Sequence, residues 1–97
     1  MLNITARSEN NTLTLSLEGR LDTTTAPGLE GRLRDDLEGV TELCIDMEKL
    51  EYISSAGLRV LLSAHKRMKG NMTVTNVNEV IMEIFEVTGF SDILNIR

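Results

Sequence analysis

Segments with the two-residue apolar period of β-strands alternate along this chain with segments that have the spacing of α-helices, and this alternation restricts the possible folds most. Residues 12–17 alternate Thr or Ser with Leu, which predicts a strand with one buried face. Residues 1–6 predict a partner strand, because the intervening residues 8–11 (Ser-Glu-Asn-Asn) are polar and turn-forming. The chain is therefore expected to begin with an antiparallel hairpin.

Three later segments have the apolar spacing of amphipathic helices, and a glycine follows each of them. The threonines at 23–25 can cap the first helix and Pro27 fits its opening turn, while Asn78 can cap the third. The expected inner faces are Leu29, Leu33 and Leu37, then Leu58, Leu61, Leu62 and Met68, and finally Ile81, Ile84, Phe85 and Thr88.

Strand-like segments separate these helices. Residues 43–47 form a short apolar run that suits a central strand covered on both faces. Residues 72–77 predict another strand, and residues 93–96 predict a last short strand or a docked tail. The resulting order β-β-α-β-α-β-α-(β) predicts an α/β fold: a mixed sheet of four to five strands with a parallel centre and helices packed against it.

Length and composition indicate a small module that acts on a protein partner. The 97 residues, 41% of them hydrophobic, suit a single domain over residues 1–97 with no room for a separate catalytic domain. A net charge of -5 and an aromatic content of 3% disfavour nucleic acid as a partner. The first residues show no charged segment followed by an apolar run, and no apolar stretch reaches the length of about 20 residues that a membrane helix needs. We therefore expect a cytoplasmic protein that does not bind membranes.

We expect no enzymatic activity, no metal site and no cofactor. Cys44 is the single cysteine and His65 the single histidine, and both lie among apolar neighbours at strand or helix spacing. His65 is placed about 15 Å from the start of the helix that follows the candidate nucleophiles Ser54 and Ser55. Ile53 stands where a hydrolase elbow needs its first glycine, and a phosphate-binding loop would need a lysine that is missing here.

Ser54 and Ser55 lie where strand-like residues give way to the helix-like residues 58–68, and their hydroxyls have two possible roles. One role is to cap the helix, whose first N–H groups lack internal partners. The other is phosphorylation by a partner kinase, since a helix N-terminus tolerates the added charge of about -1.5 to -2. Asp22 follows the second strand and is expected at the same rim of the sheet. From the residues alone, the cap and the switch have similar support.

Residues 50–62, with Ser-Ser-Ala-Gly-Leu at 54–58, resemble the signature loop and helix of STAS domains, and most closely those of the bacterial anti-sigma factor antagonists. Residues 15–22 and the threonines after them are similar to the family's Gly-x-Leu-Asp segment. Gly-Phe at 89–90 followed by Ile-Leu at 93–94 resembles the family's C-terminal end. The resemblance covers nearly the whole chain and implies a mixed sheet with helices packed on it, which agrees with the order derived above.

The resemblance also implies a partner-switching mechanism. The unphosphorylated antagonist binds an anti-sigma factor that is also a serine kinase, and this binding frees a sigma factor. The kinase then phosphorylates the antagonist and releases it, and a serine phosphatase resets the cycle. The alternative is a STAS protein of another class, a scaffold subunit or a ligand-sensing module without partner switching.

The family pattern Asp-Ser-Ser/Thr-Gly-Leu, aligned on Gly57 and Leu58, implies that Ser55 is phosphorylated. Ser54 stands in the place of the family's Asp and is the alternative acceptor, and Ala56 replaces the usual Ser or Thr. Asp22 matches the family's Asp at the partner-facing rim, although it can equally form a turn with the threonines that follow. The implied partner-binding residues are Asp22, Ser54, Ser55, Ala56, Gly57, Leu58 and Arg59.

Overall fold

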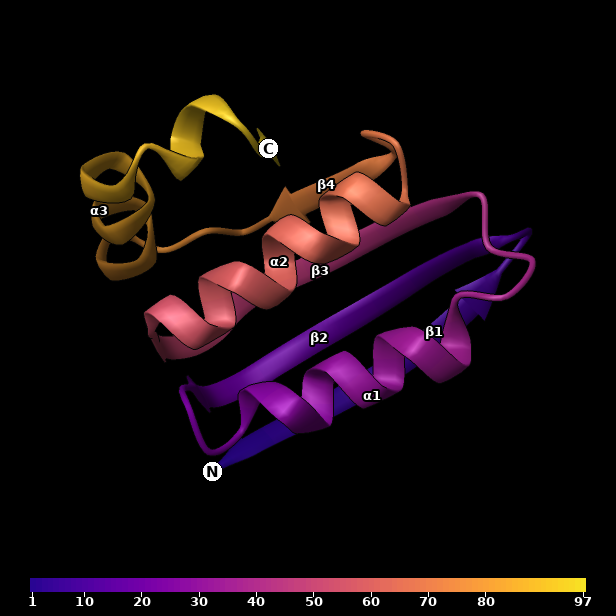
Figure 1. Ribbon diagram of the computed structural model, residues 1–97, viewed down its shortest axis with the longest axis horizontal. Helices are drawn as coiled ribbons and strands as arrows, with labels where there is room; N and C mark the ends of the chain where they lie inside the picture. Colours follow the sequence, from indigo (N-terminus) through magenta and orange to yellow (C-terminus); the bar gives the residue numbers. More distant parts are fainter.

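The computed structural model describes residues 1–97 and contains a five-stranded mixed sheet with three α-helices (Figure 1). In chain order the elements are β1 (Leu2–Glu9), β2 (Thr12–Leu21), α1 (Ala26–Asp36), β3 (Glu42–Ile53), α2 (Ser55–Arg67), β4 (Met72–Thr75), α3 (Glu79–Thr88), a 3-10 turn (Phe90–Asp92) and β5 (Asn95–Ile96). None of the helices has the length and apolar character needed to span a membrane.

The strands lie side by side in their sequence order, from β1 at one edge to β5 at the other. β1 is antiparallel to β2, and every later neighbouring pair is parallel. The predicted hairpin, parallel centre and element order are therefore confirmed. Each parallel crossover moves in the same direction across the sheet, so right-handed connections place α1, α2 and α3 on one face.

The core lies between that face of the sheet and the helices. It contains 23 buried hydrophobic residues and no buried polar side chain. Alternate positions of the three central strands contribute to it, such as Leu15, Ile45 and Val74, each fully buried. From α3, Ile81 and Phe85 complete the core at the far end, and both are fully buried.

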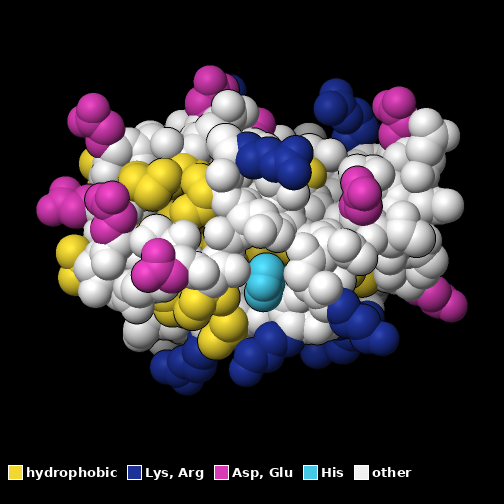
Figure 2. Space-filling model, turned by 90° about the horizontal axis from the view of Figure 1, so that it is seen from above, with side chains coloured by type: hydrophobic (Ala, Val, Ile, Leu, Met, Phe, Trp, Pro, Cys, Tyr) yellow, Lys and Arg dark blue, Asp and Glu magenta, His cyan; other side chains and the backbone are white.

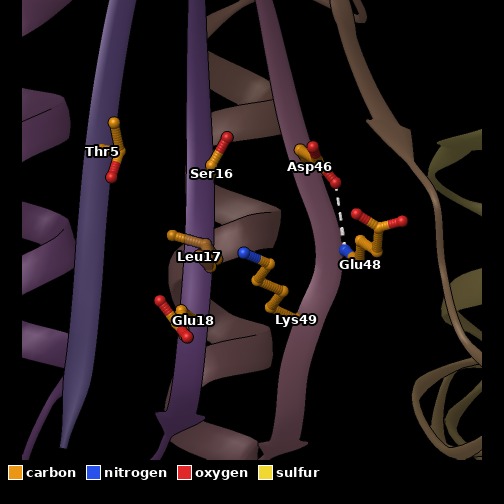
Figure 3. Close-up of a pocket in the computed structure, with 7 residues that line it drawn as sticks. All are labelled: Thr5, Ser16, Leu17, Glu18, Asp46, Glu48 and Lys49. Carbon is orange, nitrogen blue, oxygen red and sulfur yellow. Dashed lines mark hydrogen bonds between the residues drawn. The ribbon is translucent and has the colours of Figure 1, made fainter.

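The opposite face of the sheet is open, so the expectation that residues 43–47 are covered on both faces is wrong. Leu43, Ile45 and Met47 are buried, whereas Cys44 and Asp46 between them are only partly buried. Cysteine counts as apolar in a hydrophobic run, but here it occupies an outward position of a two-residue period. Figure 3 shows this face, with the helices behind the sheet and polar side chains on it that include Ser16, Asp46 and Lys49. These side chains line a hollow of about 220 Å³.

Three element predictions also need correction. α2 begins at Ser55, three residues before the predicted start, because Ser54 ends the extended chain and serves as its N-cap. β4 ends at Thr75 because Asn76 has a positive φ of 54° and turns the chain. In α3, Thr88 is exposed and does not belong to the inner face, whereas Ile84 is partly buried and packs against the core. The helix lies at the end of the molecule, as Figure 1 shows.

Candidate functional site

The carboxyl ends of β2 and β3 form the rim that carries the candidate residues. Leu21 and Ile53 are paired in the register of these parallel strands, and the backbone N–H of Ser54 donates to the Leu21 carbonyl at 2.9 Å. Asp22 directly follows Leu21, and Ser55 directly follows Ser54. Asp22 and the two serines therefore leave the sheet from neighbouring strands, as the strand order predicts.

The two serines differ in their structural roles. Ser54 is the N-cap of α2: its backbone is extended (φ -98°, ψ 176°) and its Oγ accepts a hydrogen bond of 3.5 Å from the Gly57 N–H. The Ser54 carbonyl also accepts from the Leu58 N–H at 2.9 Å. Ser55 is the first helical residue, and its side chain is exposed. The cap belongs to Ser54, which leaves the Ser55 hydroxyl accessible to a partner.

Residues 56–59 in the first turn of α2 support the rim from beneath and from one side. Gly57 and Leu58 are buried, and Ala56 is partly buried against the core. Arg59 is exposed. Among the predicted partner-binding residues of the helix, Ser55 and Arg59 thus face solvent most fully, while Gly57 and Leu58 hold the first turn of α2 against the sheet.

Asp22 forms a tight turn with the threonines that follow it. Its Oδ1 accepts hydrogen bonds from the Thr24 hydroxyl at 2.7 Å and from the backbone N–H groups of Thr24 and Thr25 at 3.0 and 3.1 Å. The Thr24 hydroxyl is the main cause that lowers the pKa of Asp22, and these backbone donors add to it against an opposing effect of desolvation. Asp22 is therefore a fixed negative charge at the rim.

Arg20 and Tyr52 extend this rim, and neither was predicted as a site residue. They are paired in register across β2 and β3, and the Arg20 guanidinium carbon lies 4.4 Å from the centre of the Tyr52 ring. The Arg20 Nε is also 3.8 Å from Asp22 Oδ2. The strand register brings together these residues, which are far apart in the sequence, and it was not available from residue patterns.

A hollow of about 350 Å³ links the Asp22 turn to the start of α2. Thr23, Pro27 and Glu30 line it on the α1 side, and Ala56 and Arg59 line it on the α2 side. The hollow therefore has an acidic group, Glu30, on one side and a basic group, Arg59, on the other, with apolar side chains between them. The rim and this hollow together form one continuous surface.

The geometry keeps the single histidine away from both serines. His65 lies ten residues after Ser55 on α2, about 15 Å along the helix axis. The Nδ1 atom of His65 is buried without a hydrogen-bond partner. No three side chains of His, Cys, Asp or Glu are grouped so that they could hold a metal ion.

Comparison with known proteins shows similarity over nearly the full chain. The family model described as the STAS domain matches residues 3–97. An anti-sigma-B factor antagonist from Bacillus subtilis (strain 168) is 28% identical, over 98% of this chain and 90% of that protein.

Solved structures share the fold at lower sequence identity. An anti-sigma factor antagonist from Mycobacterium paratuberculosis superposes with a TM-score of 0.89 at 19% identity, covering 99% of this chain and 85% of that one. The Bacillus cell fate determinant SpoIIAA in its phosphorylated form superposes with a TM-score of 0.76 at 16% identity, covering 98% and 91%.

Proposed function

Because the chain belongs to the STAS domain family, we propose that it is an anti-sigma factor antagonist controlled by phosphorylation of Ser55. In its unphosphorylated form it binds an anti-sigma factor that is also a serine kinase, and this binding frees a sigma factor. The kinase transfers the γ-phosphoryl group of ATP to the Ser55 hydroxyl, and binding ends. A serine phosphatase removes the phosphate and restores the binding form.

The division of roles between the two serines carries this proposal. Ser54 already accepts the capping hydrogen bond, whereas Ser55 is exposed at the first position of α2. A phosphate on Ser55 leaves the cap in place, and the open N–H groups of the helix start tolerate its charge. Phosphorylation can therefore change the surface without breaking the fold.

The electrostatics of the rim explain why a phosphate would end binding. Asp22 is held in its charged form by the Thr24 and Thr25 donors, so the unmodified rim already carries a negative charge. The phosphate adds about -1.5 to -2 charges at Ser55. A partner surface matched to the unmodified rim would meet repulsion or a desolvation cost at the modified one.

The relatives support the same role. The Bacillus subtilis protein described as an anti-sigma-B factor antagonist matches this chain over almost its full length. SpoIIAA, which has the same fold, has been solved in a phosphorylated form, so a phosphate is compatible with this architecture. The proposed contact residues are Asp22, Ser54, Ser55, Ala56 and Arg59 at the surface, with Gly57 and Leu58 beneath them.

The decisive experiment combines binding with mass spectrometry. The chain is mixed with the serine-kinase anti-sigma factor encoded nearest to its gene, with and without ATP. We expect a complex without ATP, and with ATP a single added phosphate on Ser55 and loss of the complex. Ser55→Ala should bind and stay bound with ATP, while Ser54→Ala should still be phosphorylated at Ser55.

Other outcomes would count against the proposal in different ways. A phosphate on Ser54 would transfer the switch to the alternative acceptor. Neither binding nor phosphate, together with assembly into a large particle on gel filtration, would favour a STAS scaffold. If the chain stays a monomer, does not bind the kinase and is not phosphorylated, a ligand-sensing module is favoured.

A further inference from the structure

Helix α3 has a second apolar stripe beside the buried one. Ile81 and Phe85 on its inner side are fully buried, but Val80 and Val87 are 56% and 81% exposed. Ile84 between them is partly buried, with one side against the core. Residues at i, i+4 and i+7 lie along one side of a helix, so these three form a continuous stripe. Of the five large hydrophobic side chains that are exposed, three lie on α3 or just after it: Val80, Val87 and Ile93.

Acidic side chains border this stripe. Glu79, Glu83 and Glu86 are exposed on the same helix, and residues 71–96 contain no Lys or Arg. Figure 2 shows hydrophobic side chains at the end of the molecule where α3 lies, with acidic side chains among them and basic side chains along the lower edge of the view.

An acidic hollow continues the surface at the N-terminal end of α3. It has a volume of about 570 Å³ and lies between β3 and α3. Glu48, Glu51 and Glu79 line it, with Lys49 as its single cation, and Val80 forms part of its wall. The stripe and the hollow therefore form one surface, which we call the α3 face: Val80, Ile84 and Val87 with Glu48, Glu51, Glu79, Glu83 and Glu86.

Charge decides which occupant suits the α3 face. A second copy packed stripe to stripe would bring the glutamates of both copies together, and like charges across an interface cost binding energy. An anionic lipid surface would be repelled for the same reason. A basic segment meets neither penalty, because its apolar side chains can cover the stripe while Lys or Arg side chains pair with the glutamates.

We propose that the α3 face docks a basic amphipathic helix of a partner protein. Apolar residues of the partner at helical spacing pack on Val80, Ile84 and Val87, in the manner of helix recognition by an apolar surface. A Lys or Arg of the partner enters the hollow beside Glu48, Glu51 and Glu79. This contact involves neither Ser55 nor its phosphorylation, so it stands or falls separately from the proposed switch.

The test uses an 18-residue helical peptide with Leu on one side and Lys on the other, and a control peptide with Glu at every Lys position. Each is titrated into the ¹⁵N-labelled chain and followed by amide chemical shifts. We expect the Lys peptide to perturb residues 79–93 and 48–51, and the Glu peptide to leave them unchanged. Added salt should weaken the binding of the Lys peptide.

Two variants test the α3 face directly. Val87→Asp and Glu83→Lys should each weaken binding of the Lys peptide at least tenfold, whereas Glu38→Lys, an exposed charge reversal after α1, should change it less than twofold. Both positions on α3 are exposed, so the variants should keep the native spectrum elsewhere.

Three results would overturn the proposal. Equal weakening by Glu83→Lys and Glu38→Lys would show that only net charge matters. Shifts in residues 79–93 that depend on protein concentration without peptide would make a second copy the occupant. Binding to phosphatidylglycerol vesicles that is lost in Val87→Asp would make a membrane the occupant.

Discussion

Gly57 lies so close to Leu21 that no side chain fits between them: a Cβ atom at Gly57 would lie 2.7 Å from the Leu21 Cγ and 2.9 Å from the Ile53 Cγ1. Leu21 is the last residue of β2, Ile53 is the last of β3, and Gly57 is in the first turn of α2. The helix start is therefore pressed directly onto the ends of both strands. This contact fixes the position of Ser54 and Ser55 relative to the ends of β2 and β3.

Gly57→Ala should lower the free energy of unfolding by about 1–3 kcal/mol, because the methyl group can be admitted only if buried side chains and the helix start move. Gly31→Ala is the matched control. Gly31 is also helical, but a Cβ atom there would meet only the Arg34 Nη2 at 3.6 Å. The control should raise stability by about 0.5–1 kcal/mol, since alanine favours the helix.

Urea unfolding of both variants measures these changes. Equal effects of the two substitutions on stability would show that close packing is not the reason for a glycine at position 57. If Gly57→Ala is stable but no longer binds its kinase, the contact is needed to position the rim for binding and not to stabilise the fold.

Asp22 should make the stability of the protein depend on pH in the acid range. Its pKa in the folded chain is lowered, chiefly by the Thr24 hydroxyl. A lowered folded pKa stabilises the protein above the ordinary value of about 3.9, and this contribution disappears as the pH falls through the folded pKa. Thr24→Val should therefore raise the pKa of Asp22 toward its ordinary value.

An NMR titration of the Asp22 carboxyl carbon in the wild type and in Thr24→Val measures this shift. Thr23→Val is the control, because the exposed Thr23 donates no hydrogen bond to Asp22. An unchanged pKa in Thr24→Val would mean that the backbone N–H groups of Thr24 and Thr25 hold the charge without the hydroxyl.

The element order followed from the sequence, because strand periods and helix spacing are local patterns. The placement of Asp22, Ser54 and Ser55 at the ends of neighbouring strands followed from the parallel connections between those elements. The open face of the sheet was not predicted. Cys44 and Asp46 alternate with Leu43, Ile45 and Met47, and counting Cys44 as apolar hid the outward positions of that strand.

Long-range register was also beyond local patterns. Arg20 stacks on Tyr52 because β2 and β3 pair with shifts in register between Ser16 and Glu18 and between Gly19 and Arg20. Two such irregularities cannot be located from a run of residues, since each depends on the partner strand. The Leu21–Gly57 contact also depends on how distant elements pack together. The glycine in the serine motif was the single local sign of it.

Asn78 should be required in its amide form. Its Oδ1 accepts from the Ile81 N–H at 3.0 Å, and its Nδ2 donates to the Leu50 carbonyl at 2.8 Å. It therefore caps α3 and ties the helix to β3 at once. Asn78→Asp keeps the cap but loses the donor and places a negative charge beside a carbonyl, which should cost about 1–3 kcal/mol.

Thermal or urea unfolding of Asn78→Asp measures this cost. Asn71→Asp, at an exposed position between α2 and β4, should change stability by less than about 0.5 kcal/mol. A loss in Asn78→Asp no larger than in Asn71→Asp would mean that capping alone holds the start of α3.

Ser54 and Ser55 should respond differently to the same substitution, whatever partner the protein has. Ser54→Ala removes the cap of α2 and should cost about 0.5–1 kcal/mol, at the low end for a cap because its hydrogen bond to the Gly57 N–H is 3.5 Å long. Ser55→Ala removes an exposed hydroxyl and should change stability by less than about 0.5 kcal/mol.

Ser54→Asp should be at least as stable as the wild type, because aspartate caps well and its charge suits the helix N-terminus. Urea unfolding of the three variants ranks them. A larger loss in Ser55→Ala than in Ser54→Ala would reverse the two roles, and Ser54 would then be the serine free to accept a phosphate.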